Sequence, residues 1–184
     1  EILENLFMYI QKKDLSHLLF MNDIYKKILN IHGNIVEFGT RWGRNLALFV
    51  SLRGIYEPYN HTRKIIGFDS FTGFPNISKK DGNHSTLKKG SYSVTKDYIN
   101  NLDKFLEKKE RELPINHIKK YELIKGDVSK TSHNYFNKNK ESIIALAVFD
   151  LDLYKPTKEA LKSILPRLSK GSIVLFDELN HSAY

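Results

Sequence analysis

Two apolar segments near the end of the chain, ALAVF and SIVLF, are each followed by acidic residues. The first leads into Asp150 and Asp152, and the second leads into Asp177 and Glu178. Segments of this length that are rich in Val, Ile and Phe and do not alternate with polar residues are typical of buried strands in a parallel sheet. The carboxyl ends of parallel strands lie at one edge of the sheet, where open α/β sheets bind ligands.

If these two strands are neighbours, up to four carboxylates share that edge. Two bare carboxylates about 4 Å apart repel each other by roughly 4 kcal/mol at an effective dielectric constant near 20. The cluster therefore requires a divalent cation, a cationic ligand or a raised pKa.

Earlier segments of the chain predict an alternation of strands and helices. The predicted strands are 34–38, 64–69, 121–127, and the two that lead into Asp150 and Asp177. The predicted helices are 14–30 with Asp14 or Ser16 as N-cap, 46–54, 95–113 with Thr95 as N-cap, 132–138, and 156–168 closed by Gly171. This alternation is typical of a doubly wound, Rossmann-like α/β fold with a mostly parallel sheet.

The predicted elements form one domain over residues 1–184, with a helical segment over about 1–32. Residues 70–93 are rich in Gly, Lys, Ser and Asn, and a loop of this length in a compact domain is often a functional lid. Since the chain stops soon after the fifth strand, we expect two further strands of the sheet to be missing and the domain to be C-terminally incomplete.

The composition excludes several classes of protein. No apolar stretch approaches the ~20 residues that span a bilayer, and the absence of cysteine excludes disulfides, thiolate metal sites and cysteine catalysis. We expect a cytoplasmic protein with no membrane partner. The net charge of +8 comes from scattered lysines, which indicates a solvated surface rather than a nucleic-acid groove, although a basic rim attracts anionic substrates. The oligomeric state stays open, and a homo-oligomer is compatible with the sequence.

The first strand ends in Glu37-Phe38-Gly39, and a turn with Gly43 leads into a helix. Glycines let the backbone turn tightly and approach a ligand, while the helix N-terminus offers free amides. Arg41 stands where a dinucleotide-binding pattern has its second glycine, and Glu37 suits a ligand with a positive group. The alternative interpretation is a glycine-containing turn without function.

Acidic residues also follow the second and third predicted strands. Asp69 stands where an acid hydrogen-bonds the ribose of an adenosine ligand, although it could equally cap a helix. Asp127 follows Gly126 and is placed to meet the adenine edge, or it simply belongs to a turn. Acids at three successive strand ends form a coherent pocket.

The segments EFGTRWGRN, GFDSFTGFP, KKGSYSV, IKGD, FDLDLYKPTKEAL and GSIVLFDE, in this order, resemble the macrocin O-methyltransferase (TylF-type) family. The resemblance covers roughly residues 20–184. It implies a class I methyltransferase fold that uses S-adenosyl-L-methionine and Mg²⁺ to methylate a sugar hydroxyl of a small-molecule sugar or sugar-nucleotide substrate.

The resemblance also implies roles for individual residues. Glu37, Gly39 and Gly43 line the methionine part of the cofactor, Asp69 holds the ribose, and Ser70 and Phe71 lie beside the adenosine. The remaining implied roles are adenine contacts (Asp127, Val128), metal ligands (Asp150, Asp177, Glu178), the catalytic base (Asp152) and a lid (Gly90, Ser91, Tyr92).

Several alternatives stay open at this point. Arg44 and Asn45 stand where many relatives have small residues, and Glu178 replaces a frequent second aspartate. Asp152 could be a metal ligand or could orient one, Trp42 and Tyr154 are interpreted as packing residues, and Asn180 and His181 could face the substrate. The acceptor could be a catechol-like or nucleic-acid hydroxyl, or the chain could bind an adenosine ligand without catalysis.

Overall fold

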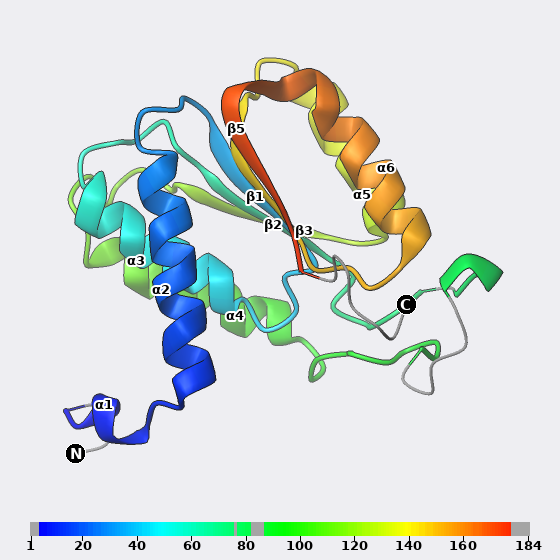
Figure 1. Ribbon diagram of the computed structural model, residues 1–184, viewed down its shortest axis with the longest axis horizontal. Coiled ribbons are helices and arrows are strands. Elements are labelled where there is room, and N and C mark those ends of the chain that lie inside the picture. The colour runs from blue at the N-terminus through cyan, green and yellow to red at the C-terminus, as the bar shows by residue number, and fades with distance from the viewer. Residues whose placement is uncertain (1–3, 76, 82–86, 178–184) are drawn as a thin grey trace.

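The computed structural model describes residues 4–75, 77–81 and 87–177. Its strands form one five-stranded sheet in the order β3-β2-β1-β4-β5, and every neighbouring pair is parallel (Figure 1). The strands are β1 (Asn34–Phe38), β2 (Ile65–Asp69), β3 (Tyr121–Lys125), β4 (Ile144–Phe149) and β5 (Leu168–Phe176). The predicted doubly wound parallel fold is therefore confirmed.

Helices cover both faces of this sheet (Figure 1). One face carries α2 (Lys12–Lys27), α3 (Arg44–Tyr56) and α4 (Tyr98–Arg111). The other face carries α5 (Val128–Lys138) and α6 (Tyr154–Ile164). Short pieces complete the description: α1 (Leu6–Tyr9) and two 3₁₀ turns, η1 (Lys79–Asp81) and η2 (Leu165–Arg167). None of the described helices has the length and apolar character needed to cross a membrane.

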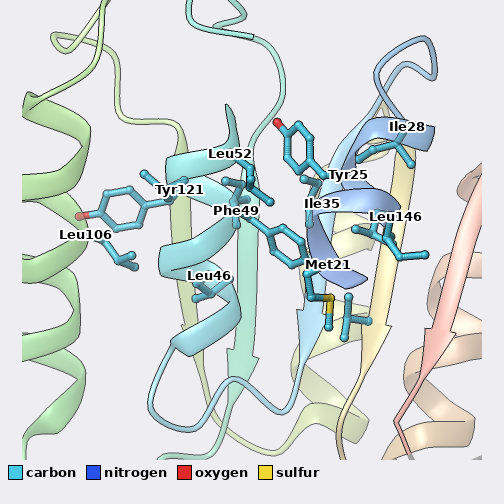
Figure 2. Packing of buried hydrophobic residues seen from close by; sticks show 14 of the residues in the cluster. Met21, Tyr25, Ile28, Ile35, Leu46, Phe49, Leu52, Leu106, Tyr121 and Leu146 are labelled. Carbon is cyan, nitrogen blue, oxygen red and sulfur yellow. The ribbon is translucent and has the colours of Figure 1, made fainter. Parts of the chain in front are cut away.

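The first face buries a core between the sheet and the helices α2, α3 and α4. Tyr25 of α2 and Phe49 of α3 are fully buried against Ile35 and Leu146 of the sheet (Figure 2). Full burial of such side chains stabilises the fold by about 1.5–3 kcal/mol each. This packing fixes α2 and α3 over the strands β1 and β4.

The second face contains a row of phenylalanine rings, one from each of four neighbouring strands. Phe38 lies between Phe68 and Phe149, with ring centroids 5.1 and 4.9 Å away. Phe176 stacks on Phe149 at 4.9 Å. Neighbouring rings occupy paired register positions. The row therefore aligns the carboxyl ends of these four strands, because each ring belongs to the last or second-last residue of its strand.

Three predicted helix boundaries are wrong. The helix α2 begins at Lys12 with Gln11 as N-cap, and α4 begins at Tyr98 with Asp97 as N-cap, neither with a side-chain capping bond. Asp14 and Ser16 thus lie inside a helix, and Thr95 precedes the α4 cap and contributes only its carbonyl oxygen, which accepts from the Tyr98 amide. Gly171 lies within β5, where a φ of +92° bends the strand rather than closing a helix.

The C-terminal end of α2 is anchored by a buried arginine. The Arg63 guanidinium donates hydrogen bonds to the carbonyl oxygens of Ile28, Ile31 and Gly33 at 2.9–3.1 Å. It also pairs with the Glu57 carboxylate, with Nε 2.7 Å from Oε2. A cation near the last carbonyls satisfies acceptors that the helix leaves unpaired and complements its dipole.

The turn after β1 brings two backbones into contact. Gly39 has a φ of +96°, and a Cβ added there would lie 1.7 Å from the Asp150 carbonyl oxygen. Only glycine allows both the left-handed conformation and this approach. Gly39 therefore serves the tight turn that the sequence predicts and also lets the tips of β1 and β4 meet.

We expect Gly39→Ala to lower the free energy of unfolding by more than about 3 kcal/mol, because strain at positive φ and overpacking add. Gly90→Ala is the matched control, since Gly90 has a φ of +80° and no described atom lies within 4 Å of an added Cβ. It should cost only about 1 kcal/mol. Equal losses in chemical denaturation would contradict the close approach.

Candidate functional site

The carboxyl ends of the strands meet at one edge, with the acids of β4 and β5 on adjacent tips. The Asp150 amide donates to the Phe38 carbonyl oxygen at 2.8 Å, and the Asp177 amide donates to that of Phe149 at 3.0 Å. The ladder therefore continues one residue beyond each strand. The expectation that the two acid-terminated strands are neighbours is confirmed.

A cavity of about 310 Å³ opens at this edge. Most of the predicted site residues line it: Gly39, Asp69, Ser70, Asp127, Val128, Asp150, Asp152 and Asp177. Residues from five separate strand ends are thus brought to one wall. Glu37, Gly43 and Phe71 are not among the lining residues that the structure describes, and Glu178, Asn180 and His181 lie outside the described residues.

Asp69 is fixed at the end of β2 by two backbone amides. Its Oδ2 accepts from the Arg41 amide at 2.8 Å, and its Oδ1 accepts from the Phe71 amide at 2.6 Å. Burial raises the pKa of Asp69, and these hydrogen bonds act in the opposite direction. The carboxylate therefore joins the turns after β1 and β2 while it still faces the cavity with remaining lone pairs.

Asp127 combines a structural role with a position at the cavity, and its predicted contact with adenine stays a prediction. It is the N-cap of α5, because its Oδ1 accepts from the Ser129 amide at 2.9 Å. It also lines the cavity together with Val128. Capping holds the carboxylate in one orientation at the start of a helix, where the dipole favours negative charge.

Glu37 is not among the described lining residues of the cavity. It is the last of three side chains that are linked by hydrogen bonds and that begin with His17 on α2. The Asn45 amide donates to Glu37 Oε1 at 2.8 Å, and Asn45 Oδ1 lies 2.7 Å from His17 Nε2. Glu37 is 2% exposed, and its Oε2 has no hydrogen-bond partner among the described residues. A buried carboxylate oxygen without a hydrogen bond is costly. The buried Thr40 hydroxyl also lacks a partner among the described residues and lowers the pKa of this carboxyl, so a donor of the fold competes here with any donor of a ligand.

The pKa of Glu37 is raised to about 8, mainly by burial and also by the nearby carboxylates of Asp150 and Asp69, against the lowering effect of the Asn45 and Thr40 side chains. In the absence of a ligand, Glu37 thus holds a proton near neutral pH. A bound cation would favour the ionised form.

The loop from Ser70 onward folds back over the cavity. The Phe74 amide donates to the Ser91 carbonyl oxygen and the Gly90 amide donates to that of Phe74, both at 3.0 Å. The Phe74 and Tyr92 rings pack at 5.2 Å, and the Arg41 guanidinium lies 4.8 Å from the Tyr92 ring centroid. Gly73, Phe74 and Tyr92 line the cavity, so part of the segment predicted as a lid borders the site, and its role as a lid stays a prediction.

Backbone strain is concentrated on this wall. Three non-glycine residues that line the cavity have positive φ: Arg41 at 46°, Tyr92 at 62° and Asp152 at 54°. Such conformations cost about 1–3 kcal/mol each and cluster at functional sites.

Sequence reasoning missed several contributors to the site. Arg41 was considered only as a departure from a glycine pattern, and Asn45 only as a departure from the family. Phe74, Pro75 and Pro156 line the cavity without having been predicted. His17 gave no signal, because it is 28 residues from Asn45 and its neighbours in the chain are ordinary helix residues.

The fit to a divalent cation rests on two carboxylates. Asp150 and Asp177 are exposed on adjacent strand tips and supply hard oxygen donors of the kind that Mg²⁺ prefers. Within residues 4–75, 77–81 and 87–177, no group of three or more potential ligands is arranged to hold a metal. The third predicted ligand, Glu178, lies outside these residues.

Comparison with protein families matches residues 10–183 to Macrocin-O-methyltransferase (TylF). The chain belongs to this family. The resemblance inferred from the strand-end motifs is therefore confirmed. The family is one of O-methyltransferases, so the chain is an enzyme of this kind rather than a non-catalytic binding module. A comparison with curated proteins found no match.

Two solved structures are similar to the chain over nearly its whole length. The crystal structure of CalS11, calicheamicin methyltransferase, is 43% identical with a TM-score of 0.95, over 98% of this chain and 70% of that chain. The apo structure of CalS11, described as TDP-rhamnose 3′-O-methyltransferase, is 40% identical with a TM-score of 0.84, over 99% of this chain and 71% of that chain. The Rossmann-like sheet described above is thus a methyltransferase fold.

The raised pKa of Glu37 predicts a pH-dependent stability. Between the pKa near 4.3 of an unfolded Glu and about 8, the folded protein binds a proton that the unfolded chain has lost. The free energy of unfolding therefore falls as the pH rises through this range.

Glu37→Gln keeps an oxygen that accepts from Asn45 but has no carboxyl group to titrate. The difference in free energy of unfolding between this variant and the wild type, measured by urea denaturation, should therefore shift in favour of the variant as the pH rises from 5 to 8. Glu122→Gln serves as control, because Glu122 is half-buried and pairs with Lys64. Parallel wild-type and Glu37→Gln curves would contradict the assignment.

Proposed function

We propose that the protein transfers the methyl group of S-adenosyl-L-methionine to a sugar hydroxyl with the assistance of Mg²⁺. The observation that carries the proposal is the shared cavity, which Asp150, Asp152 and Asp177 line together with Gly39 and Asp69. The CalS11 relative is named for a sugar O-methylation, and this supports a sugar acceptor here.

Three groups of this chain would bind the methyl donor. Asp69 would accept hydrogen bonds from the ribose hydroxyls, and Asp127 and Val128 would border the adenine. The Oε2 atom of Glu37, which lacks a donor among the described residues, would pair with the positive methionine end. Gly39, Gly43, Ser70 and Phe71 would shape the surrounding turns.

Asp150 and Asp177, with Glu178, would hold the cation. When bound, Mg²⁺ would favour the alkoxide form of the acceptor hydroxyl. Asp152 would accept the hydroxyl proton while the oxygen forms a bond to the methyl carbon and the carbon–sulfur bond of the sulfonium breaks. The products are the methyl ether and S-adenosylhomocysteine, and the cavity contributes mainly by positioning the two reactants.

Asp69→Ala should weaken S-adenosylhomocysteine binding more than about tenfold in titration calorimetry, since it removes charge-assisted hydrogen bonds to the ribose. Asp23→Ala, a loss of an exposed carboxylate on α2, is the control and should bind normally. Unchanged affinity in the Asp69 variant would refute the ribose assignment.

EDTA should abolish methyl transfer in the full-length protein, and added Mg²⁺ should restore it, while S-adenosylhomocysteine binding persists in EDTA. Full activity under chelation would refute the role of the metal.

Asp152→Asn should bind S-adenosylhomocysteine normally and transfer the methyl group at least about 100-fold more slowly, as expected for loss of a general base. Asn tolerates the left-handed conformation that Asp152 adopts at a φ of 54°, so the backbone should be preserved. Wild-type turnover in this variant would assign the base elsewhere.

A further inference from the structure

Two lysines lie over one tyrosine whose neighbours in the chain line the cavity. The Nζ atoms of Lys80 and Lys158 are 4.7 and 5.5 Å from the ring centroid of Tyr154. Leu153 and Pro156, on either side of Tyr154 in the chain, line the cavity. Tyr154 is 44% exposed, and its ring packs against the two lysine side chains rather than in the core.

A buried carboxylate holds this cluster together. Asp81 Oδ1 accepts from the Tyr154 amide at 2.7 Å, and Asp81 Oδ2 accepts from the amide and hydroxyl of Ser78 at 2.6 and 2.7 Å. Asp81 is only 6% exposed. It therefore attaches the segment that carries Lys80 to the start of α6, 73 residues further along the chain.

The carboxylate nearest to this cluster, Asp81, accepts hydrogen bonds from Ser78 and Tyr154 and forms no ion pair with either lysine among the described residues. Among the described residues, neither Lys80 nor Lys158 forms an ion pair, and the neighbouring Glu159 is already paired with Lys162 and His133. Lys158 and Lys80 together lower the pKa of the Tyr154 hydroxyl. Two ammonium groups and a phenolic hydroxyl thus form a set of donors that is suited to an anion.

The cavity itself is unsuitable for an anion. Five carboxylates line it (Asp69, Asp127, Asp150, Asp152 and Asp177), and Arg41 is the only cation among its described lining residues. A neutral sugar ring fits beside these acids, especially with a metal bound. A phosphate group attached to that sugar would be repelled by these carboxylates and attracted to Lys80 and Lys158.

We propose that Lys80, Lys158 and Tyr154 bind the diphosphate of a nucleoside diphosphate sugar whose sugar ring enters the cavity. The inference rests on the proposed sugar O-methylation and specifies the acceptor as an activated sugar rather than a neutral glycoside. The lysines supply charge, the Tyr154 hydroxyl donates a hydrogen bond to a phosphate oxygen, and Asp81 positions Lys80.

Thymidine diphosphate is the probe, measured by titration calorimetry in EDTA at low salt, with and without saturating S-adenosylhomocysteine. We expect it to bind the wild type at least about tenfold more tightly than thymidine, because the site recognises the phosphates. Lys80→Met/Lys158→Met should weaken this binding about tenfold or more, whereas binding of thymidine should not change.

Lys104→Met/Lys108→Met is the matched control, because it removes the same charge from exposed positions of α4 on the opposite face of the sheet. It should change the affinity for thymidine diphosphate less than about twofold, as expected for distant screened charges. Tyr154→Phe should reproduce part of the loss in the lysine variant.

Equal affinities for thymidine diphosphate in the wild type and the Lys80/Lys158 variant would overturn the proposal. So would a loss confined to Arg41→Met, which would place the phosphates inside the cavity. S-adenosylhomocysteine binding is read separately and should be the same in all lysine variants. Its absence in the wild type would refute the proposed function, while a phosphate preference that depends on Lys80 and Lys158 would still stand.

Discussion

The parallel register of the sheet at its last residues is the constraint on which the site depends. The rings of Phe68, Phe38, Phe149 and Phe176 pack in one row beneath the carboxyl edge, and each such contact contributes about 0.5–1.5 kcal/mol beyond its buried area. Because side chains alternate between faces, a shift of one residue in β2, β4 or β5 would turn its ring to the opposite face and displace the aspartate that follows it. The core thereby determines where the carboxylates stand.

Charge is distributed unevenly around this edge. Carboxylates line the cavity, while Lys80 and Lys158 lie over Tyr154 beside it, and the buried Asp81 attaches the segment of Lys80 to the start of α6. A chain with a net charge of +8 can thus attract anions at long range and still present a cavity lined by carboxylates at short range. The combination suits a substrate with an uncharged reacting part and an ionised remote part, and explains why the overall charge alone indicates so little about function.

Much of the architecture is predictable from the sequence, because most strands are predominantly apolar and are followed by, or end in, Gly or Asp. The neighbouring positions of Asp150 and Asp177 follow from that pattern together with the parallel rule. Helix starts were less predictable, since α2 and α4 begin at residues without side-chain capping bonds. The His17–Asn45–Glu37 chain depends on tertiary packing of α2 over α3, which no local pattern encodes. The burial of Glu37 and the exposure of Tyr154 also depend on tertiary packing, so the sequence does not predict them.

The anchoring of α2 by Arg63 has a mechanical consequence. The guanidinium holds the carbonyl oxygens at the C-terminal end of the helix, whereas His17 lies 11 residues before Ile28, about 16 Å along the axis. A rotation of the helix by about 5° around this fixed end would displace the imidazole by roughly 1.4 Å. That displacement is enough to break its 2.7 Å contact with Asn45. Small changes in the inclination of one surface helix are therefore transmitted to the innermost carboxylate of the protein.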